Sequence, residues 1–262
     1  LQSLVINANP RESTLDLVQA AWREFVARGD ELHDLVGKKT WPFPVPLWYE
    51  SPHTTYQVGP VEGDYGVIGI DGSQIYPDRF YSNLDCFVIN TGGLSVAYRQ
   101  TVSEVEFFSQ PYVYTLRDAF KRYGHEVGES KDLIDLIREE FEFKDALAVA
   151  DAFPKKHPGL PFLCLFDGSF VFWHLEGKQA EVRELFLSTY MLYLRRFQEQ
   201  GLPLAGYISL PRNRELCNVL RLVMCERFVA MGTFCFADQV CACKVLQEIT
   251  DVDLVSYFLA PG

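Results

Sequence analysis

The sequence contains no apolar run long enough to cross a membrane. None of its hydrophobic stretches approaches the roughly 18 consecutive apolar residues of a membrane-spanning helix. The N-terminal residues also lack the basic and apolar segments of a secretory signal peptide. We therefore expect a cytosolic protein that does not associate with membranes.

The sequence also lacks a disulfide framework, an excess of positive charge and a nucleotide-binding loop. Its seven cysteines are odd in number and follow no regular spacing, which is typical of a reducing compartment. The formal net charge of −11 argues against indiscriminate binding of nucleic acid, although a localised basic channel is compatible with it. No Gly-rich loop followed by Lys, the pattern of a Walker-type site, is present.

What the chain does have is ample material for a core. Its 262 residues are 48% hydrophobic and 14% aromatic, which fits one large domain or a core domain with appendages. Apolar spacing predicts a helix over residues 13–36, with Ser13 or Thr14 as its cap. The three prolines between Trp41 and Trp48 exclude a regular helix there and predict a packed linker. We therefore expect an N-terminal helix and Pro-rich linker over residues 1–60, and a main domain over residues 61–262.

Two short apolar runs end in the same Asp-Gly-Ser sequence. The run 67–70 leads to Asp71, and the run 162–166 leads to Asp167. Each run predicts a buried strand that presents its Asp at the edge of a sheet, where Gly lets the chain turn. One such motif is usually only a turn, but two aspartates delivered in this way can meet at one site.

The other predicted elements define the fold class. The sequence Gly92-Gly93 predicts the turn of a hairpin between strands 85–91 and 94–98. Later elements are an extended run at 102–108, a helix at 130–153 capped by Ser130, a short strand at 170–175, a helix at 179–200, a strand at 204–210 and a helix at 212–228. This order predicts an α/β fold with a mixed sheet flanked by helices, in which the first three strands are antiparallel. It is the RNase H-like order, in which the strands that carry Asp71 and Asp167 lie side by side.

Clustered carboxylates repel one another unless a hard divalent cation such as Mg²⁺ or Mn²⁺ lies between them. Two such ions can activate a water and stabilise the leaving oxygen of a phosphodiester. A third acid would come from the helix at 130–153, which carries Glu139, Glu140 and Glu142. Helical spacing favours Glu142, with Glu139 and Glu140 as alternatives. Glu142 lies beside the helix's apolar stripe, which consists of Ile134, Ile137, Phe141 and Ala148. The competing interpretation is a solvated helix face.

Four segments of the chain form a set of motifs in a defined order. They are Gly69-Ile-Asp71-Gly-Ser73-Gln-Ile, Arg138-Glu-Glu-Phe-Glu142, Leu165-Phe-Asp167-Gly-Ser169-Phe and Ala205-Gly-Tyr-Ile-Ser-Leu-Pro211-Arg212-Asn-Arg214. Through them the chain resembles the NurA nuclease family over roughly residues 60 to 230. The resemblance implies an RNase H-like domain that cuts DNA with Mn²⁺, as a single-strand endonuclease and 5′-to-3′ exonuclease. It also implies a homodimer that works with a HerA-type hexameric helicase or translocase in DNA end resection and repair, with Asp71, Glu142 and Asp167 as metal ligands.

The chain departs from this family near its C-terminus. The family places a further metal-site histidine there, whereas all five histidines of this chain lie at or before His174. We expect either a shortened C-terminal part or an incomplete site. Asp238, Asp251 and Asp253 are possible substitutes, although loop acids at the surface are the simpler interpretation.

Three further side chains are candidates for contact with DNA. Arg212 and Arg214 follow a predicted strand, and their guanidinium groups match the geometry of phosphate oxygens. The alternative is an ion pair with an acid such as Glu215. Tyr207 could stack on an unpaired base, although packing within the protein is the commoner use of such a ring.

The remaining histidine and cysteine candidates favour structural roles. His174, beside Trp173, is expected to be a satisfied structural histidine. Four cysteines near the C-terminus, Cys225, Cys235, Cys241 and Cys243, lack the close pair spaced by two to four residues that is usual in zinc sites. The sequence favours reduced, partly buried thiols for them.

Two other functions compete with a nuclease. A NurA-like adaptor subunit of a helicase complex, with impaired catalysis, would account for the acidic balance and the missing histidine. An actin-like or sugar-kinase phosphotransferase shares the strand order and also uses Asp-Gly turns around phosphates. Such an enzyme needs two lobes around a nucleotide, which this length barely allows.

Overall fold

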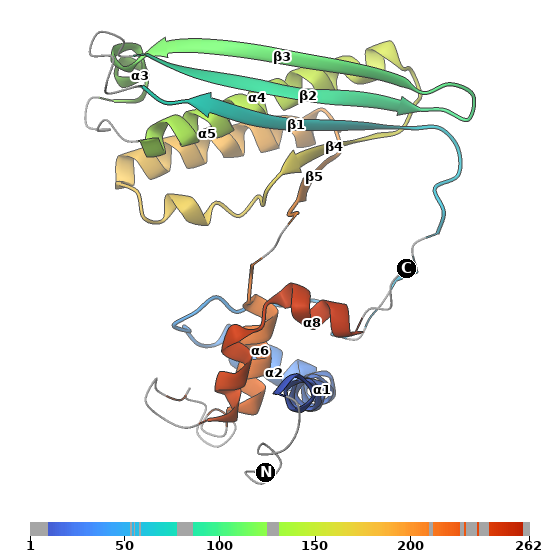
Figure 1. The fold of residues 1–262 in the computed structure, drawn as a ribbon, viewed down its shortest axis with the longest axis vertical. Helices are drawn as coiled ribbons and strands as arrows, with labels where there is room; N and C mark the ends of the chain where they lie inside the picture. The colour runs from blue at the N-terminus through green and yellow to red at the C-terminus, as the bar shows by residue number, and fades with distance from the viewer. Residues whose placement is uncertain are drawn as a thin grey trace. The chain divides into compact units, whose positions relative to one another are not determined.

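The computed structural model describes residues 10–52, 54, 56–57, 59–77, 86–124, 131–209, 212–225, 228, 235 and 241–258. The chain forms two compact units, Pro60–Ser209 and the combination of Leu1–Gly59 with Leu210–Gly262. The first contains a sheet and the second is helical (Figure 1). Within the described ranges, no helix is both long and apolar enough to cross a membrane.

The sheet unit is built on a five-stranded mixed sheet in the order β3-β2-β1-β4-β5. Strands β1, β2 and β3 are antiparallel neighbours, whereas β4 runs parallel to β1 and β5 runs parallel to β4. The strands are β1 (Tyr65–Ile75), β2 (Cys86–Tyr98), β3 (Glu104–Thr115), β4 (Phe162–Asp167) and β5 (Leu204–Tyr207). This order and these directions confirm the predicted RNase H-like mixed sheet.

Helices cover the sheet on the face that carries its buried side chains. Helix α4 (Lys131–Lys156) packs against β1 and β2, and α5 (Ala180–Glu199) packs against α4 (Figure 1). The predicted stripe of α4 is buried at Ile134, Ile137 and Phe141 but exposed at Ala148. Each fully buried side chain of this size contributes about 1.5–3 kcal/mol. The unit also contains two short elements, α3 (Leu116–Tyr123) and η1 (Trp173–Leu175).

The Gly92-Gly93 pair lies inside a strand, so the predicted hairpin turn is wrong. Strand β2 continues through both glycines, which pair with Asp71 and Ile70 of β1. A Cβ atom at Gly93 would overlap the carbonyl oxygen of Gly69 and lie 2.8 Å from the ring of Phe108. Close approach of three strands, not a turn, therefore requires glycine here. The fold class is unaffected because β3 supplies the third antiparallel strand.

Other predicted elements differ in extent. The helix predicted over residues 13–36 is two helices, α1 (Pro10–Ala27) and α2 (Gly29–Gly37), so neither Ser13 nor Thr14 stands at its start. Residues 170–175 form no strand, and η1 lies there instead. The predicted cap Ser130 lies outside the described residues.

The helical unit has a core of its own. It joins α1 and α2 to α6 (Glu215–Met224), η2 (Ala242–Glu248) and α8 (Asp251–Phe258). The side chains of Trp41, Phe43 and Trp48 pack against this core, and Asn218 Nδ2 donates to the carbonyl of Pro44 at 2.8 Å. The Pro-rich segment is thus a packed connector, as predicted. The limits 1–60 and 61–262 remain a prediction, to which the structure adds that residues after 210 pack with the N-terminal segment.

Substitution of Gly93 by Ala should destabilise the sheet unit by about 2 kcal/mol, because the added methyl group has no room between the strands. Gly69→Ala is the matched control, since a Cβ atom there meets nothing within 4 Å. Urea unfolding of both variants measures the difference. Equal stabilities for Gly93→Ala and wild type would contradict the proposed close packing.

Candidate functional site

Asp71 and Asp167 lie next to each other at the ends of paired parallel strands. The last register pair of β1 and β4 joins Ile70 to Phe166, and each Asp is the next residue. In both strands the preceding residue is buried and the Asp is exposed, so both carboxylates lie on the face opposite α4. They line one cleft of about 640 Å³. The predicted meeting of the two aspartates is therefore present in the geometry.

The chain turns immediately after the second aspartate. Gly168 has a φ of +129°, a conformation that favours glycine, and its amide donates to the carbonyl of Tyr207 at 2.8 Å. Gly206 on β5 is equally constrained, because a Cβ atom there would lie 2.5 Å from the carbonyl oxygen of Gly168. This turn holds Asp167 at the rim of the cleft.

Within the described part of the chain, neither aspartate has a cationic partner. The Gly72 amide donates to Asp71 Oδ1 at 2.7 Å, and among the described residues neither Asp71 nor Asp167 forms an ion pair. Two exposed carboxylates on neighbouring strands therefore face one cleft, and no cation of the described ranges pairs with them. Carboxylate oxygens in such a set are ligands for a hard divalent cation.

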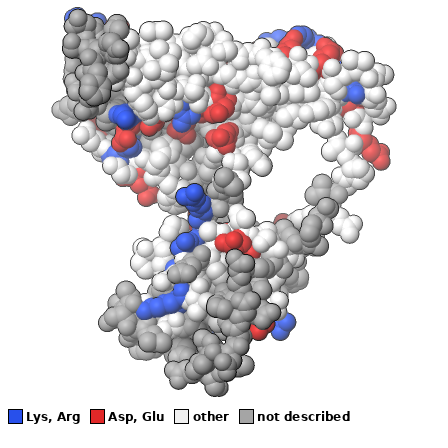
Figure 2. Space-filling view, in the orientation of Figure 1, with Lys and Arg blue, Asp and Glu red and all other residues white. Residues whose placement is uncertain are grey.

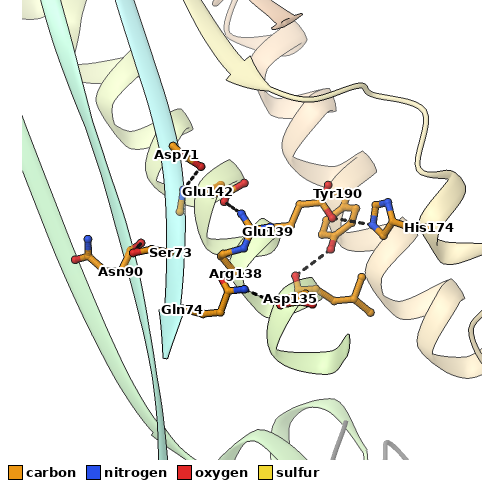
Figure 3. Close-up of polar contacts among 12 residues, drawn as sticks. Asp71, Ser73, Gln74, Asn90, Asp135, Arg138, Glu139, Glu142, His174 and Tyr190 are labelled. Carbon is orange, nitrogen blue, oxygen red and sulfur yellow. Dashed lines mark hydrogen bonds and ion pairs between the residues drawn. The ribbon is translucent and has the colours of Figure 1, made fainter. Parts of the chain in front are cut away.

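Glu142 approaches the same strand from the helical side. It is buried, forms an ion pair with Arg138, and packs so closely on Gly72 that a Cβ atom there would overlap its carboxylate. Figure 3 shows Asp71 on β1 and Glu142 on α4 as neighbours, with Arg138 against Glu142. Burial raises the pKa of Glu142 to about 7; Arg138 opposes this, and the charges of Asp71 and Glu139 add to it. Glu142 does not line the cleft, so the structure brings Asp71 and Asp167 together and places Glu142 beside them.

The other two candidate glutamates of α4 interact with side chains outside the cleft. Glu140 is buried and accepts from Arg122 Nη2 at 2.7 Å and from the Tyr123 hydroxyl at 2.8 Å. Glu139 pairs with His174 Nε2 at 2.9 Å (Figure 3). His174 is thus a satisfied histidine, as predicted. Of the three candidate glutamates, Glu142 is the one that packs on Gly72, next to Asp71.

Two cleft residues were not anticipated from the sequence. Asn90 and Ser73 line the cleft beside Asp71, and they face each other in the pairing of β1 with β2. Ser109 Oγ donates to Asn90 Oδ1 at 2.8 Å. Their positions follow from the register between β1 and β2. This register could not be predicted from the sequence, because the Gly92-Gly93 pair was interpreted as a turn.

The predicted DNA contacts fall in different units. Tyr207 is 60% exposed and lines the cleft with the two aspartates. Arg212 and Arg214 are exposed in the helical unit, where Arg214 Nη1 donates to the carbonyl of Gln247. On the visible face of this unit, Lys and Arg side chains form a short row (Figure 2). The expected alternative for the arginines, an ion pair with Glu215, is absent from the described residues.

The proposed substitutes for a C-terminal histidine have structural partners. Asp251 accepts from the amides of Leu216 and Cys217, at 3.2 and 2.8 Å, and so caps the N-terminus of α6. Asp253 accepts from the amide and the hydroxyl of Thr250 at 2.9 and 2.6 Å. Asp238 lies outside the described residues. The capping role of Asp251 gives it a task that needs no metal.

Comparison with known proteins identifies one family. A model described as the NurA domain matches residues 65–262, which is well over half of the chain. A comparison with proteins of curated function finds no match.

Three solved structures show weaker likeness. The NurA nuclease from Sulfolobus solfataricus is 14% identical with a TM-score of 0.35, and the match covers 65% of this chain and 56% of that one. A NurA structure bound to dAMP and manganese is 13% identical with a TM-score of 0.22, covering 90% and 48%. Prototype foamy virus protease-reverse transcriptase is 19% identical with a TM-score of 0.30, covering 64% and 20%. The chain thus spans about half the length of the two NurA structures, and the family assignment depends on the family match.

The raised pKa of Glu142 predicts a pH dependence of stability in chelator. Between its ordinary value of 4.5 and about 7 the folded state binds more protons than the unfolded state, so stability falls as pH rises through this window. Relative to wild type, Glu142→Gln should gain up to about 3 kcal/mol between pH 4.5 and 7 and then level off. Denaturant unfolding at several pH values measures this.

The control for this experiment is Asp151→Asn, an exposed acid on the same helix that pairs with Lys155. Its stability relative to wild type should change by less than about 0.5 kcal/mol over the same range. A flat profile for Glu142→Gln would contradict the conclusion that burial of this carboxylate outweighs its pairing with Arg138.

Proposed function

This chain belongs to the NurA domain family, and on that premise we propose that it is a metal-dependent deoxyribonuclease. One observation carries the proposal: two exposed carboxylates, Asp71 and Asp167, end neighbouring parallel strands and line one cleft, and no described residue forms an ion pair with either of them. Hydrolysis of a phosphodiester requires positive charge at the reacting phosphate. The carboxylate oxygens of the cleft would bind a divalent metal ion, and this ion would supply the positive charge.

Asp71 and Asp167 would hold a Mn²⁺ or Mg²⁺ ion in the cleft. Glu142, buried on the helical side of β1 beside Asp71, is proposed as the third acid. The oxygen donors suit these hard cations, and a relative within the same family has been solved with manganese. When bound, the metal would lower the pKa of a coordinated water and neutralise charge on the phosphate. The protein would hold the ligand side chains in position. The pairing of β1 with β4 sets the spacing of the two aspartates, and the ion pair with Arg138 orients Glu142.

The proposed substrate is DNA with unpaired bases. Tyr207 presents an exposed ring in the same cleft as the carboxylates, where a base could stack. Arg212 and Arg214 would bind phosphates from the helical unit, in accord with the row of basic side chains there. We assign a single-strand endonuclease and a 5′-to-3′ exonuclease activity in DNA end processing, which is what membership of the family suggests.

We also propose a homodimer that works with a HerA-like hexameric helicase or translocase. Strand β3 lies at one edge of the sheet and exposes Val105, Phe107 and Val113 by 51%, 80% and 69%. An edge strand with exposed apolar side chains is suited to association with a second copy or with a partner. The partner itself is inferred from the family alone.

Asp71→Asn and Asp167→Asn should each reduce cleavage at least about 100-fold, because each removes a negatively charged ligand from the cleft. Labelled single-stranded and double-stranded DNA, incubated with Mn²⁺ or with chelator, measures the activity. Thermal unfolding of the same preparations shows whether the fold is retained. Cleavage by either folded variant at the wild-type rate would overturn the proposed site.

The matched control is again Asp151→Asn, which removes an acid from the same unit but not from the cleft. It should cleave at the wild-type rate. Calorimetric titration with Mn²⁺ separates a nuclease from an adaptor, because an adaptor would show no binding that depends on Asp71 and Asp167.

Tyr207→Ala should weaken binding of single-stranded DNA about tenfold, since stacking of a base on an aromatic ring contributes about 1–3 kcal/mol. Fluorescence anisotropy with Ca²⁺ in place of Mn²⁺ measures binding without cleavage. Tyr49→Ala is the control, because Tyr49 is 92% exposed and lies outside the cleft. Equal losses in the two variants would show that the cleft tyrosine has no special role.

A further inference from the structure

Four cysteines that are scattered in the sequence meet in the helical unit. Cys225 follows the last residue of α6, Cys241 precedes η2, and Cys243 lies in its first turn. Together with Cys235 they place four Sγ atoms within 4.8 Å of one another, and the Sγ atoms of Cys235 and Cys243 are 3.2 Å apart. No such convergence was expected, because only the pair Cys241 and Cys243 is close in the sequence.

The cluster has the size of a site for one metal ion. Four thiolates at about 2.3 Å from a tetrahedral zinc lie about 3.8 Å from one another, which matches the compact arrangement of these sulfurs. A four-iron cluster spreads its cysteines over a wider tetrahedron, since each binds a different iron atom. Three of the four cysteines are buried and Cys241 is half-buried, which is typical of a closed structural site.

A positive side chain lies close to two of the four sulfurs. Arg221 precedes Cys225 by one helical turn on α6, and its Nη1 donates to Asn218 Oδ1 at 2.9 Å. Burial lowers the pKa of Arg221, whereas the nearby sulfurs of Cys243 and Cys235 act to raise it. Its charge would offset part of the net charge of −2 that four thiolates and one divalent ion carry together.

We propose that Cys225, Cys235, Cys241 and Cys243 bind one structural zinc ion as four thiolates. Binding exchanges four S–H bonds for four Zn–S bonds and releases the thiol protons to solvent, so the step needs no oxidant. Through Cys225, Cys241 and Cys243, the ion would link the C-terminal end of α6 to the start of η2 within the helical unit. This site is separate from the carboxylate cleft in its residues and in the chemistry of its ligands.

Elemental analysis of the full chain tests the site. Protein purified anaerobically with reductant, from cells supplied with both zinc and iron, should contain about one zinc per chain. Cys241→Ser and Cys243→Ser should each contain at least about fivefold less zinc. Cys217→Ser is the matched control, since Cys217 is a buried thiol of α6 outside the cluster, and it should retain the metal.

Wild-type protein gives a second measurement if the variants do not fold. Stepwise mercurial titration should release its zinc with consumption of about four thiols, and Co²⁺ substitution should give the absorption of tetrahedral thiolate coordination. Absence of metal after reconstitution with Zn²⁺, iron with acid-labile sulfide, or a Cys235–Cys243 disulfide in the reduced preparation would each overturn the proposal. Equal zinc in Cys243→Ser and wild type would do the same.

Discussion

The candidate site depends on the register between β1 and β4. Ile70 and Phe166 pair on the buried face, which puts the next residue of each strand, Asp71 and Asp167, on the opposite face. A slip of one residue would bury one carboxylate in the core. The ring of Phe166 stacks on Phe143 of α4 with centroids 4.3 Å apart, so packing under the sheet fixes the register above it. Core packing and the placement of the two carboxylates are thus two consequences of one strand pairing.

Elements were predicted correctly from the sequence where a local apolar pattern identifies a buried strand or helix face. The two apolar runs before Asp-Gly-Ser identified β1, β4 and the meeting of their aspartates, and the stripe of α4 identified its buried face. The prediction failed at Gly92-Gly93, because a glycine required by close approach of neighbouring strands looks the same in sequence as a glycine required by a turn. The strand predicted at residues 170–175 was also wrong, because the aromatic side chains there pack equally well from a 3₁₀ helix.

The choice among the three glutamates of α4 shows a different limit. Helical spacing placed Glu142 beside the apolar stripe, but the decisive contacts belong to other parts of the chain. Glu140 accepts hydrogen bonds from Arg122 and Tyr123 of α3. Glu139 pairs with His174 of η1. Glu142 packs against β1 because Gly72 has no side chain there. None of these neighbours is within helical reach in the sequence, so only the tertiary structure distinguishes the three acids.

The two metal sites that we infer respond differently to chelation, which affects how nuclease assays are interpreted. Mn²⁺ or Mg²⁺ on exposed carboxylates exchanges readily, whereas zinc on four thiolates, three of them buried, contributes to folding itself. Prolonged treatment with a strong chelator can therefore abolish activity by unfolding the helical unit while the carboxylate cleft remains intact. Loss of activity on chelation is informative about Asp71 and Asp167 only if Mn²⁺ alone restores it. Restoration that requires zinc as well would locate the defect in the cysteine cluster, because thiolates select zinc over the hard cations that the carboxylates bind.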